Sequence, residues 1–273
     1  MSVKEKRKRK LATGQCVDVP SQIRPLLEKI GRIADQERVS AYAVGGCVRD
    51  WLLGVARTTD LDVALAGDGI VFANRVAKAL GTSVKPHEQF GTATLVIEQA
   101  PGDSRRPKKT TPAPSSAPLR IDVASCRKER YAEPAAYPKV TSGSLQDDLF
   151  RRDFTINAMA VAINPKPFGQ LIDPFGGFQD LQARRLRILH PNSFLDDPSR
   201  ILRAVRFAQR FGLTLEPKTA QCLRQAVVSG VLSRLNRGRL RKELDRMVEE
   251  PDPLACLSRL SQWLAEALGK PQS

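Results

Sequence analysis

The sequence predicts an α/β domain followed by a smaller domain of packed helices. An apolar run typical of a strand occurs at 41–44, and runs with the alternation of half-buried strands occur at 58–65 and 119–124. Farther along the chain the apolar residues recur at helical spacing, and no internal repeat is visible. We therefore expect an α/β domain over residues 21–173 and a helical domain over residues 174–273.

The first elements are predicted in the N-terminal third. Residues 1–20 begin with a lysine- and arginine-rich run and predict a basic, disordered arm. Apolar residues between 23 and 33 have the spacing of an amphipathic helix, with Ser21 placed as its N-cap. The strand at 41–44 leads through a glycine turn into a short helix over 48–53.

Farther along the chain, segments with predicted helices alternate with polar segments that have no apolar periodicity. A helix is expected over 70–80, whereas residues 100–118 mix five prolines with basic residues and predict a flexible insertion. Residues 129–145 are a second polar stretch. In the helical domain, apolar spacing marks three or four helices between 220 and 264, and Trp263 should complete their small core.

Two carboxylates share one face of the second predicted strand. Because successive side chains of a strand point to opposite faces, Asp60 and Asp62 lie on one side and Leu61 on the other. Two carboxylates that face the same way repel each other unless a cation lies between them, and their hard oxygen atoms suit Mg²⁺. The alternative interpretation is a solvated strand face. The neighbouring residues decide between a metal site and this alternative.

A glycine turn precedes these aspartates. Gly45 and Gly46 allow the backbone to bend sharply and to approach a ligand closely. Free N–H groups at the start of the following helix, together with Arg49 in its first turn, suit a phosphate group. The glycine spacing matches neither a dinucleotide-binding fingerprint nor a P-loop. Joined to the aspartate pair, the turn indicates a nucleoside triphosphate held by backbone and metal.

Two further segments carry charged residues in regular patterns. Asp122 lies on the polar face of the strand at 119–124 and is a candidate third metal ligand, with a surface aspartate as the alternative. A helix should begin after Asp197, which is placed to cap it. Arg200, Arg203 and Arg206 form a stripe beside its apolar stripe. From the residues alone, a solvated helix face is the favoured interpretation of these arginines.

Five ordered segments over roughly residues 25–250 resemble the class II tRNA nucleotidyltransferases and bacterial poly(A) polymerases of the polymerase-β superfamily. They are the glycine turn at 45–50, the aspartate pair at 60–62, and the segments 151–160, 173–181 and 196–208. Residues 122–127 are similar to a further stretch of that family. The resemblance implies an α/β head domain of the polymerase-β nucleotidyltransferase type, followed by an α-helical neck.

The resemblance also implies roles for individual residues. Asp60, Asp62 and Asp122 would be catalytic, with Asp60 and Asp62 as Mg²⁺ ligands, because two ions held by three carboxylates would activate a 3′-hydroxyl and steady the pyrophosphate leaving group. Such phosphoryl transfer needs no histidine or cysteine nucleophile. Nucleotide binding is implied for Gly45, Gly46, Arg49, Arg152, Asp197, Arg200, Arg203 and Arg206.

Some of these roles are more specific. In the family, the residues that match Asp197 and Arg200 pair with the base edge of the incoming nucleotide, so the protein itself would serve as the template. Asp196 stands where the family more often has glutamate. Asp153 is expected to be structural, and Thr155 and Asn157 are expected either to hold the metal-site strand or to belong to the site itself.

The composition favours a nucleic-acid partner. Lys and Arg total 44 against 29 acidic residues, for a net charge of +15, which attracts polyanions and makes binding salt-dependent. The basic first residues lack the apolar run of a secretory signal, and no segment has the length of a membrane span. Five cysteines without a C-x-x-C pair are simplest to explain as reduced thiols in the cytoplasm.

We therefore expect an enzyme that adds C and A from CTP and ATP to the 3′ end of tRNA and so completes its CCA end. A poly(A) polymerase, or a CC-only or A-only adding enzyme, has the same motifs and is the main alternative. A non-catalytic RNA-binding remnant is the second. The family's body and tail domains are missing from this chain, so another part of the protein or a partner would have to anchor the RNA.

Overall fold

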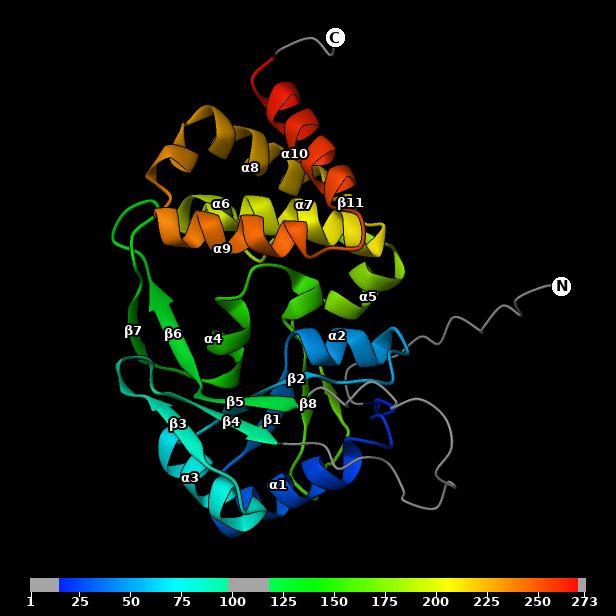
Figure 1. Ribbon diagram of the computed structural model, residues 1–273, viewed down its shortest axis with the longest axis vertical. Coiled ribbons are helices and arrows are strands. Elements are labelled where there is room, and N and C mark those ends of the chain that lie inside the picture. Colours follow the sequence, from blue (N-terminus) through cyan, green and yellow to red (C-terminus); the bar gives the residue numbers. More distant parts are fainter. Residues whose placement is uncertain (1–14, 98–117, 270–273) are drawn as a thin grey trace, which may run out of the picture.

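A mixed seven-stranded sheet forms the centre of the head domain in the computed structural model, which describes residues 15–97 and 118–269 (Figure 1). The sheet order is β3-β4-β5-β2-β1-β8-β9. Strands β2 and β5 run parallel, whereas the other neighbours in this sheet run antiparallel. The strand bounds are β1 (Ala41–Val44), β2 (Asp60–Leu65), β3 (Val84–His87), β4 (Thr92–Ile97), β5 (Leu119–Ser125), β8 (Ala160–Ala162) and β9 (Leu171–Ile172).

Helices α1 (Arg24–Gln36) and α3 (Gly69–Leu80) cover one face of this sheet (Figure 1). Leu61 and Val63 of β2 are 1% exposed and join the core under these helices, as the alternation of the strand predicts. The predicted helix over 70–80 is confirmed, and the Asp68 carboxylate caps its first turn. Ser21 is not the cap of α1, because that helix begins after Ile23.

The N-terminal segment is more ordered than predicted. Residues 1–14 lie outside the described part, but Cys16 bridges Gln170 in β-fashion, and Val17 and Val19 are buried. The disordered arm predicted over 1–20 is therefore wrong for residues 15–20, because two buried valines anchor them to the head. The predicted insertion over 100–118 lies outside the described residues except for Pro118.

A helix and a hairpin stand on the other face of the sheet. Residues 129–145, a polar stretch in the sequence, largely form a hairpin of β6 (Arg127–Arg130) and β7 (Lys139–Ser142) that leads into α4 (Leu145–Phe150). The apolar stretch after Asp153 forms a short 3-10 turn, η2 (Thr155–Asn157), followed by the buried strand β8. The remaining head elements are α2 (Gly46–Leu52) and a second 3-10 turn, η1 (Glu88–Phe90).

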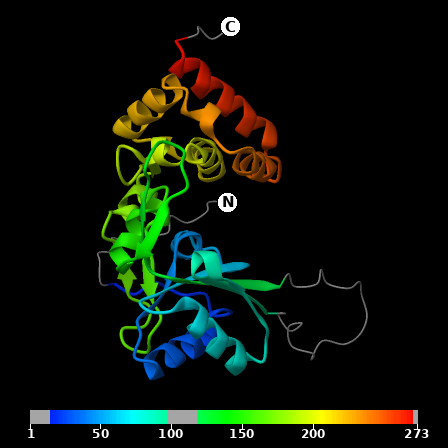
Figure 2. The ribbon, with the colours of Figure 1, turned by 90° about the vertical axis from the view of Figure 1, so that its left-hand side faces the viewer.

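The helical neck lies on the side of the sheet opposite α1 and α3, as Figure 2 shows. Phe154, Phe194 and Phe207 are buried in its core, and the partly buried Trp263 packs against that core as predicted. Leu254 and Leu257 are exposed, contrary to expectation. Its elements are α5 (Gly177–Gln182), α6 (Ser193–Asp196), α7 (Ser199–Phe211), α8 (Pro217–Val228), η3 (Val231–Arg234), α9 (Arg237–Val248), α10 (Pro253–Ala267) and the short pair β10 (Arg185–Leu186) and β11 (Thr214–Leu215).

Within residues 15–97 and 118–269, no helix combines the length and the apolar composition that a bilayer crossing needs. The five cysteines, all in this part of the chain, are unpaired.

Candidate active site

Three carboxylates meet on the face of the sheet that α1 and α3 leave uncovered. In the parallel pairing of β2 with β5, Asp62 lies beside Asp122 and Asp60 beside Arg120. Residues at matching positions of neighbouring strands project to the same face, so all of these side chains lie together. Asp60 and Asp62 are exposed while Leu61 between them is buried, which confirms the predicted division of the strand into two faces.

The electrostatics of this carboxylate group fit a divalent cation. The pKa of Asp62 is raised because surrounding protein atoms desolvate its carboxylate, and because Asp122 and Asp60 repel it, while Arg152 acts in the opposite direction. A hard cation between the carboxylates would relieve that repulsion. Asp122 is partly occupied by protein donors, since it accepts hydrogen bonds from Thr94 Oγ1 at 2.6 Å and Arg120 Nε at 3.2 Å.

Asp60 and Asp62 therefore fit the role of metal ligands better than Asp122 does in this arrangement. No group of three His, Cys, Asp or Glu side chains among the described residues is arranged to hold a metal ion by itself. The expected third ligand is in the correct place beside Asp62, but its carboxylate forms an ion pair with Arg120 at 3.0 Å.

The glycine turn lies next to Asp62. Gly45 has a positive φ of 80°, and a Cβ there would stand 2.5 Å from Nη1 of Arg152 and 3.4 Å from a carboxylate oxygen of Asp62. Glycine is thus required at position 45 by both conformation and space. At Gly46 a Cβ would meet only ordinary contacts with Arg49, so the protein itself does not demand glycine there.

Arg152 brings positive charge to this turn. Its Nη2 donates to Asp148 at 3.0 Å, and its buried Nε has no hydrogen-bond partner among the described residues. A buried N–H group without an acceptor is costly, so it marks a place where a ligand oxygen would be stabilised. Asp148, which the sequence analysis did not single out, also accepts from Arg151 at 2.7 Å and so holds both arginines of the segment.

The guanidinium of Arg49 lies at the glycine turn but is held by protein groups. It is only 5% exposed, its Nη1 donates to Asn157 at 2.6 Å, and its guanidinium lies 4.4 Å from the ring centre of Phe211 at the end of α7. The side chain therefore joins the head to the neck. Its predicted contact with a phosphate group stays a prediction.

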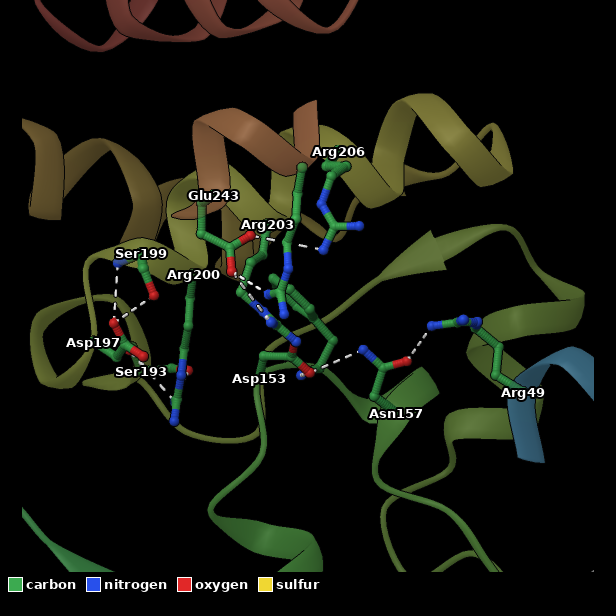
Figure 3. Close-up of polar contacts among 12 residues, drawn as sticks. Arg49, Asp153, Asn157, Ser193, Asp197, Ser199, Arg200, Arg203, Arg206 and Glu243 are labelled. Atoms are coloured by element: carbon green, nitrogen blue, oxygen red, sulfur yellow. Dashed lines mark hydrogen bonds and ion pairs between the residues drawn. The ribbon is translucent and has the colours of Figure 1, made fainter. Parts of the chain in front are cut away.

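A chain of polar contacts continues from Arg49 across the domain boundary (Figure 3). Asn157 donates to Asp153 at 3.0 Å, and Asp153 accepts from Arg203 Nε at 2.8 Å. Burial opposes ionisation of Asp153, but Arg203 and Asn157 outweigh it and lower the pKa to about 2. Asp153 is thus structural, as predicted. Asn157 serves this boundary, and Thr155 donates to Asp180, so these hydrogen bonds go to groups outside the strand of the metal site.

Arg200 and Arg206 of the arginine stripe of α7 are buried and Arg203 is half-buried, which neither interpretation of the sequence anticipated. Arg206 is 7% exposed and binds Glu250 at 3.1 Å, with Glu243 3.7 Å away, and Arg210 also binds Glu250. Arg203 reaches Glu243 at 3.6 Å in addition to Asp153. Glu243 and Glu250 were not recognised in the sequence. Glu250 lies just beyond the end of α9, so helical spacing along the sequence could not show that both glutamates face α7.

Asp197 and Arg200 lie at the start of α7 (Figure 3). Asp197 Oδ1 accepts from Ser199 N at 3.1 Å and Ser199 Oγ at 2.6 Å, so the carboxylate holds the first turn although the helix itself begins at Ser199. Arg200 is 5% exposed and donates to Ser193 Oγ at 2.6 Å and to the carbonyl of Arg151 at 2.7 Å. The start of α7 is thereby fixed to the segment that carries Arg152.

The comparisons with known proteins agree with this architecture. The family model described as the poly(A) polymerase head domain matches residues 41–187. The A-adding tRNA nucleotidyltransferase of Geobacter sulfurreducens is 42% identical over 86% of this chain and 25% of its own length. The enzyme of the same name from Halalkalibacterium halodurans is 41% identical over 86% of this chain and 51% of its own.

A solved structure extends the likeness to the neck. The apo form of a CCA-adding enzyme superimposes with a TM-score of 0.81 at 38% identity, over 94% of this chain and 58% of that one. The chain thus spans between a quarter and about three-fifths of the length of the proteins it matches.

Proposed function

Because the chain belongs to the family of the poly(A) polymerase head domain, we propose that it is a nucleotidyltransferase that extends the 3′ end of tRNA, releasing pyrophosphate. The observation that carries this proposal is the placement of Asp62 between Asp60 and Asp122, beside the turn at Gly45. Carboxylates on a rigid sheet beside a close backbone approach are what metal-assisted transfer to a hydroxyl group requires.

The metal role rests on the two exposed carboxylates. Asp60 and Asp62 would hold Mg²⁺, with Asp122 beside them once it releases Arg120. When bound, the ion would lower the pKa of the RNA 3′-hydroxyl and neutralise charge on the triphosphate.

The chain's own residues would position the nucleotide. Arg152 would donate its unpartnered Nε–H to a ligand oxygen near Gly45. Asp197 and Arg200 would read the base edge, because they share the start of one rigid helix that is fastened to the Arg152 segment. Arg203 and Arg206 already have carboxylate partners, so we assign them to holding α7 in place rather than to the nucleotide.

Addition of the terminal A is the reaction we favour. Two relatives at 42% and 41% identity carry the name A-adding tRNA nucleotidyltransferase. Complete CCA addition, the expectation from the sequence, is the second candidate. It is supported by the structural likeness to a CCA-adding enzyme over nearly the whole chain.

Product lengths separate these reactions. The protein is incubated with tRNA that ends before CCA, after CC or after CCA, and with CTP or ATP offered separately. We expect one A on tRNA ending in CC and no product from CTP. CTP incorporation followed by a single A would establish CCA addition, and incorporation of C residues alone would indicate a CC-adding enzyme.

Two further outcomes identify the remaining alternatives. Long tails on RNA that already ends in A would indicate a poly(A) polymerase. Binding of tRNA without incorporation of either nucleotide, in the presence of Mg²⁺, would identify a non-catalytic RNA-binding protein.

A further inference from the structure

A groove of about 620 Å³ lies between the β6–β7 hairpin, α4 and the segment that leads into α7. Its lining includes Phe150, Phe175 and His190, with Asp196 3.9 Å from His190, and also Glu129 and Tyr131. None of the residues assigned above to nucleotide or metal binding lines it. Its volume is that of a site for a small organic group.

One wall of the groove is aromatic and accessible. Phe150, in the last turn of α4, is 44% exposed, and its ring centre lies 5.7 Å from that of Phe175 and 5.3 Å from that of His190. Burial, and the charge of Arg200, lower the pKa of His190 to about 4, so the imidazole is neutral at pH 7. The wall thus presents aromatic faces that carry no charge.

The polar groups of the groove do not favour a polyphosphate. Its two cations are already paired, Lys128 with Asp147 at 3.7 Å and Arg151 with Glu129 at 3.2 Å. Asp196 adds a further carboxylate. Glu129 and Asp147 are engaged by these cations and by Tyr131 and Ser144, whereas among the described residues Asp196 forms no ion pair with a lysine or arginine. The groove therefore suits a flat ring that stacks on the wall and donates an N–H group from its edge to Asp196.

The groove adjoins the residues of the proposed active site. The backbone carbonyl of Arg151, which lines the groove, accepts a hydrogen bond from Arg200 Nη2 at 2.7 Å. Asp148 joins Arg151 to Arg152, and Arg152 in turn lies beside Gly45 and next to Asp62. A group held in the groove is therefore separated from the metal-site strand by the single helix α4 and the segment that follows it.

We propose that this groove binds an unpaired adenine or cytosine base near the 3′ end of the RNA substrate, stacked on Phe150. The inference rests on the proposed action on RNA 3′ ends and adds the place where the acceptor strand is held. Adenine and cytosine both have an exocyclic amino group that can donate to Asp196, whereas uracil presents a carbonyl at the corresponding position.

The test measures RNA binding without turnover. A tRNA acceptor stem–loop carrying the fluorescent adenine analogue 2-aminopurine at its unpaired 3′ end is titrated with protein, in the absence of nucleotide and metal. The wild-type protein should quench the fluorescence through stacking. Phe150→Leu, which keeps apolar bulk without an aromatic face, should weaken binding by between about five- and 150-fold, the effect of one lost base–aromatic stack.

Matched variants separate stacking from folding. Phe150→Tyr should restore both the affinity and the quenching. Leu254→Ala, an exposed apolar residue on α10 in the neck, should behave as the wild type. Equal binding by the wild type and Phe150→Leu, or no fluorescence change with the wild type, would overturn the inference.

Steady-state kinetics of nucleotide addition test the inference in a second, independent way. With active protein, Phe150→Leu should raise the KM for RNA and leave the KM for ATP unchanged. A raised KM for ATP with an unchanged KM for RNA would show that the groove serves the incoming nucleotide, and the inference would be rejected. Protein that adds no nucleotide would contradict the proposed function alone, because the stacking measurement needs no turnover.

Discussion

Asp62 on β2 and Asp153 beside η2 both have an arginine nearby, but their surroundings act on them in opposite directions. Asp153 is buried and accepts from Phe154, Asn157 and Arg203, which lowers its pKa to about 2. Asp62 accepts no side-chain hydrogen bond from the residues that the structure describes, and its pKa is raised. A carboxylate that protein donors saturate contributes to stability, whereas one left beside repelling carboxylates is available to a cation.

The largest effect should be on catalysis, at Asp62. Asp62→Asn removes a proposed metal ligand, and several kcal/mol of transition-state stabilisation should be lost with it. The rate of nucleotide addition should therefore fall at least about 100-fold. The melting temperature should stay the same or rise, because a repelled carboxylate is lost. Single-turnover addition and thermal melting measure the two quantities. Asp245→Asn, on the exposed side of α9, is the control. Wild-type addition by Asp62→Asn would remove the distinction between the two aspartates.

Asp153→Asn should have the largest effect on stability. It leaves the Arg203 guanidinium without its closest carboxylate, and breaking such a buried pair costs about 3–5 kcal/mol at pH 7. Since the pKa of Asp153 is lowered from 3.8 to about 2, the stability that it adds is present above 3.8 and is lost as the pH falls toward about 2. Urea unfolding at several pH values should show the wild type and the variant converging in that window. If the difference in unfolding free energy between the wild type and the variant does not change with pH, the shape of the Asp153 side chain, and not its charge, determines the stability.

Asp197→Ala tests a residue between these extremes, since its carboxylate has one oxygen engaged with Ser199. If it reads the base edge, selection of ATP over the other nucleoside triphosphates should weaken by about 1–3 kcal/mol. Ser199→Ala, which removes only the hydroxyl partner, is the matched control. Competition assays with mixed nucleotides measure selectivity. Slower turnover with unchanged selectivity would place Asp197 with Asp153, as a structural group.

The smallest effect is expected for the pair of Arg206 and Glu250. A double-mutant cycle with Arg206→Met and Glu250→Gln should give a coupling of about 0.5–3 kcal/mol in unfolding free energy and no coupling in the KM for ATP. Coupling that is found in the KM rather than in stability would return Arg206 to the nucleotide site, where the sequence analysis placed it.

The sequence was most informative where one residue's neighbours along the chain determine its surroundings. The alternation through Asp60 to Leu65 predicted both the strand and the face that carries the carboxylates. The apolar spacing predicted α3 and the helices α7 to α10, because an amphipathic pattern needs only one apolar surface to pack against. Alternation and resemblance both pointed to Asp122, but the parallel pairing of β2 with β5 that brings it beside Asp62 was not predicted.

Long-range partners could not be predicted from local patterns. Arg49 and Arg206 are next to aromatic rings and glutamates that lie far away in sequence, so their burial depends on how the neck packs on the head. The same limit applies to residues 129–145. Their polar composition resembles that of a loop, but pairing of β6 with β7 satisfies the backbone groups, and the segment becomes a hairpin.

The antiparallel pairing of β4 with β5 makes the head tolerant of sequence insertion. Ile97 and Leu119 face each other at the end of that pair, so the residues between them connect two points that the sheet already holds together. Doubling the length of such a connection adds only about 0.6 kcal/mol of closure entropy. An epitope or fluorescent peptide inserted between these residues should therefore leave Asp122, three residues along β5, in its place, which makes this hairpin end a practical position for labelling the protein.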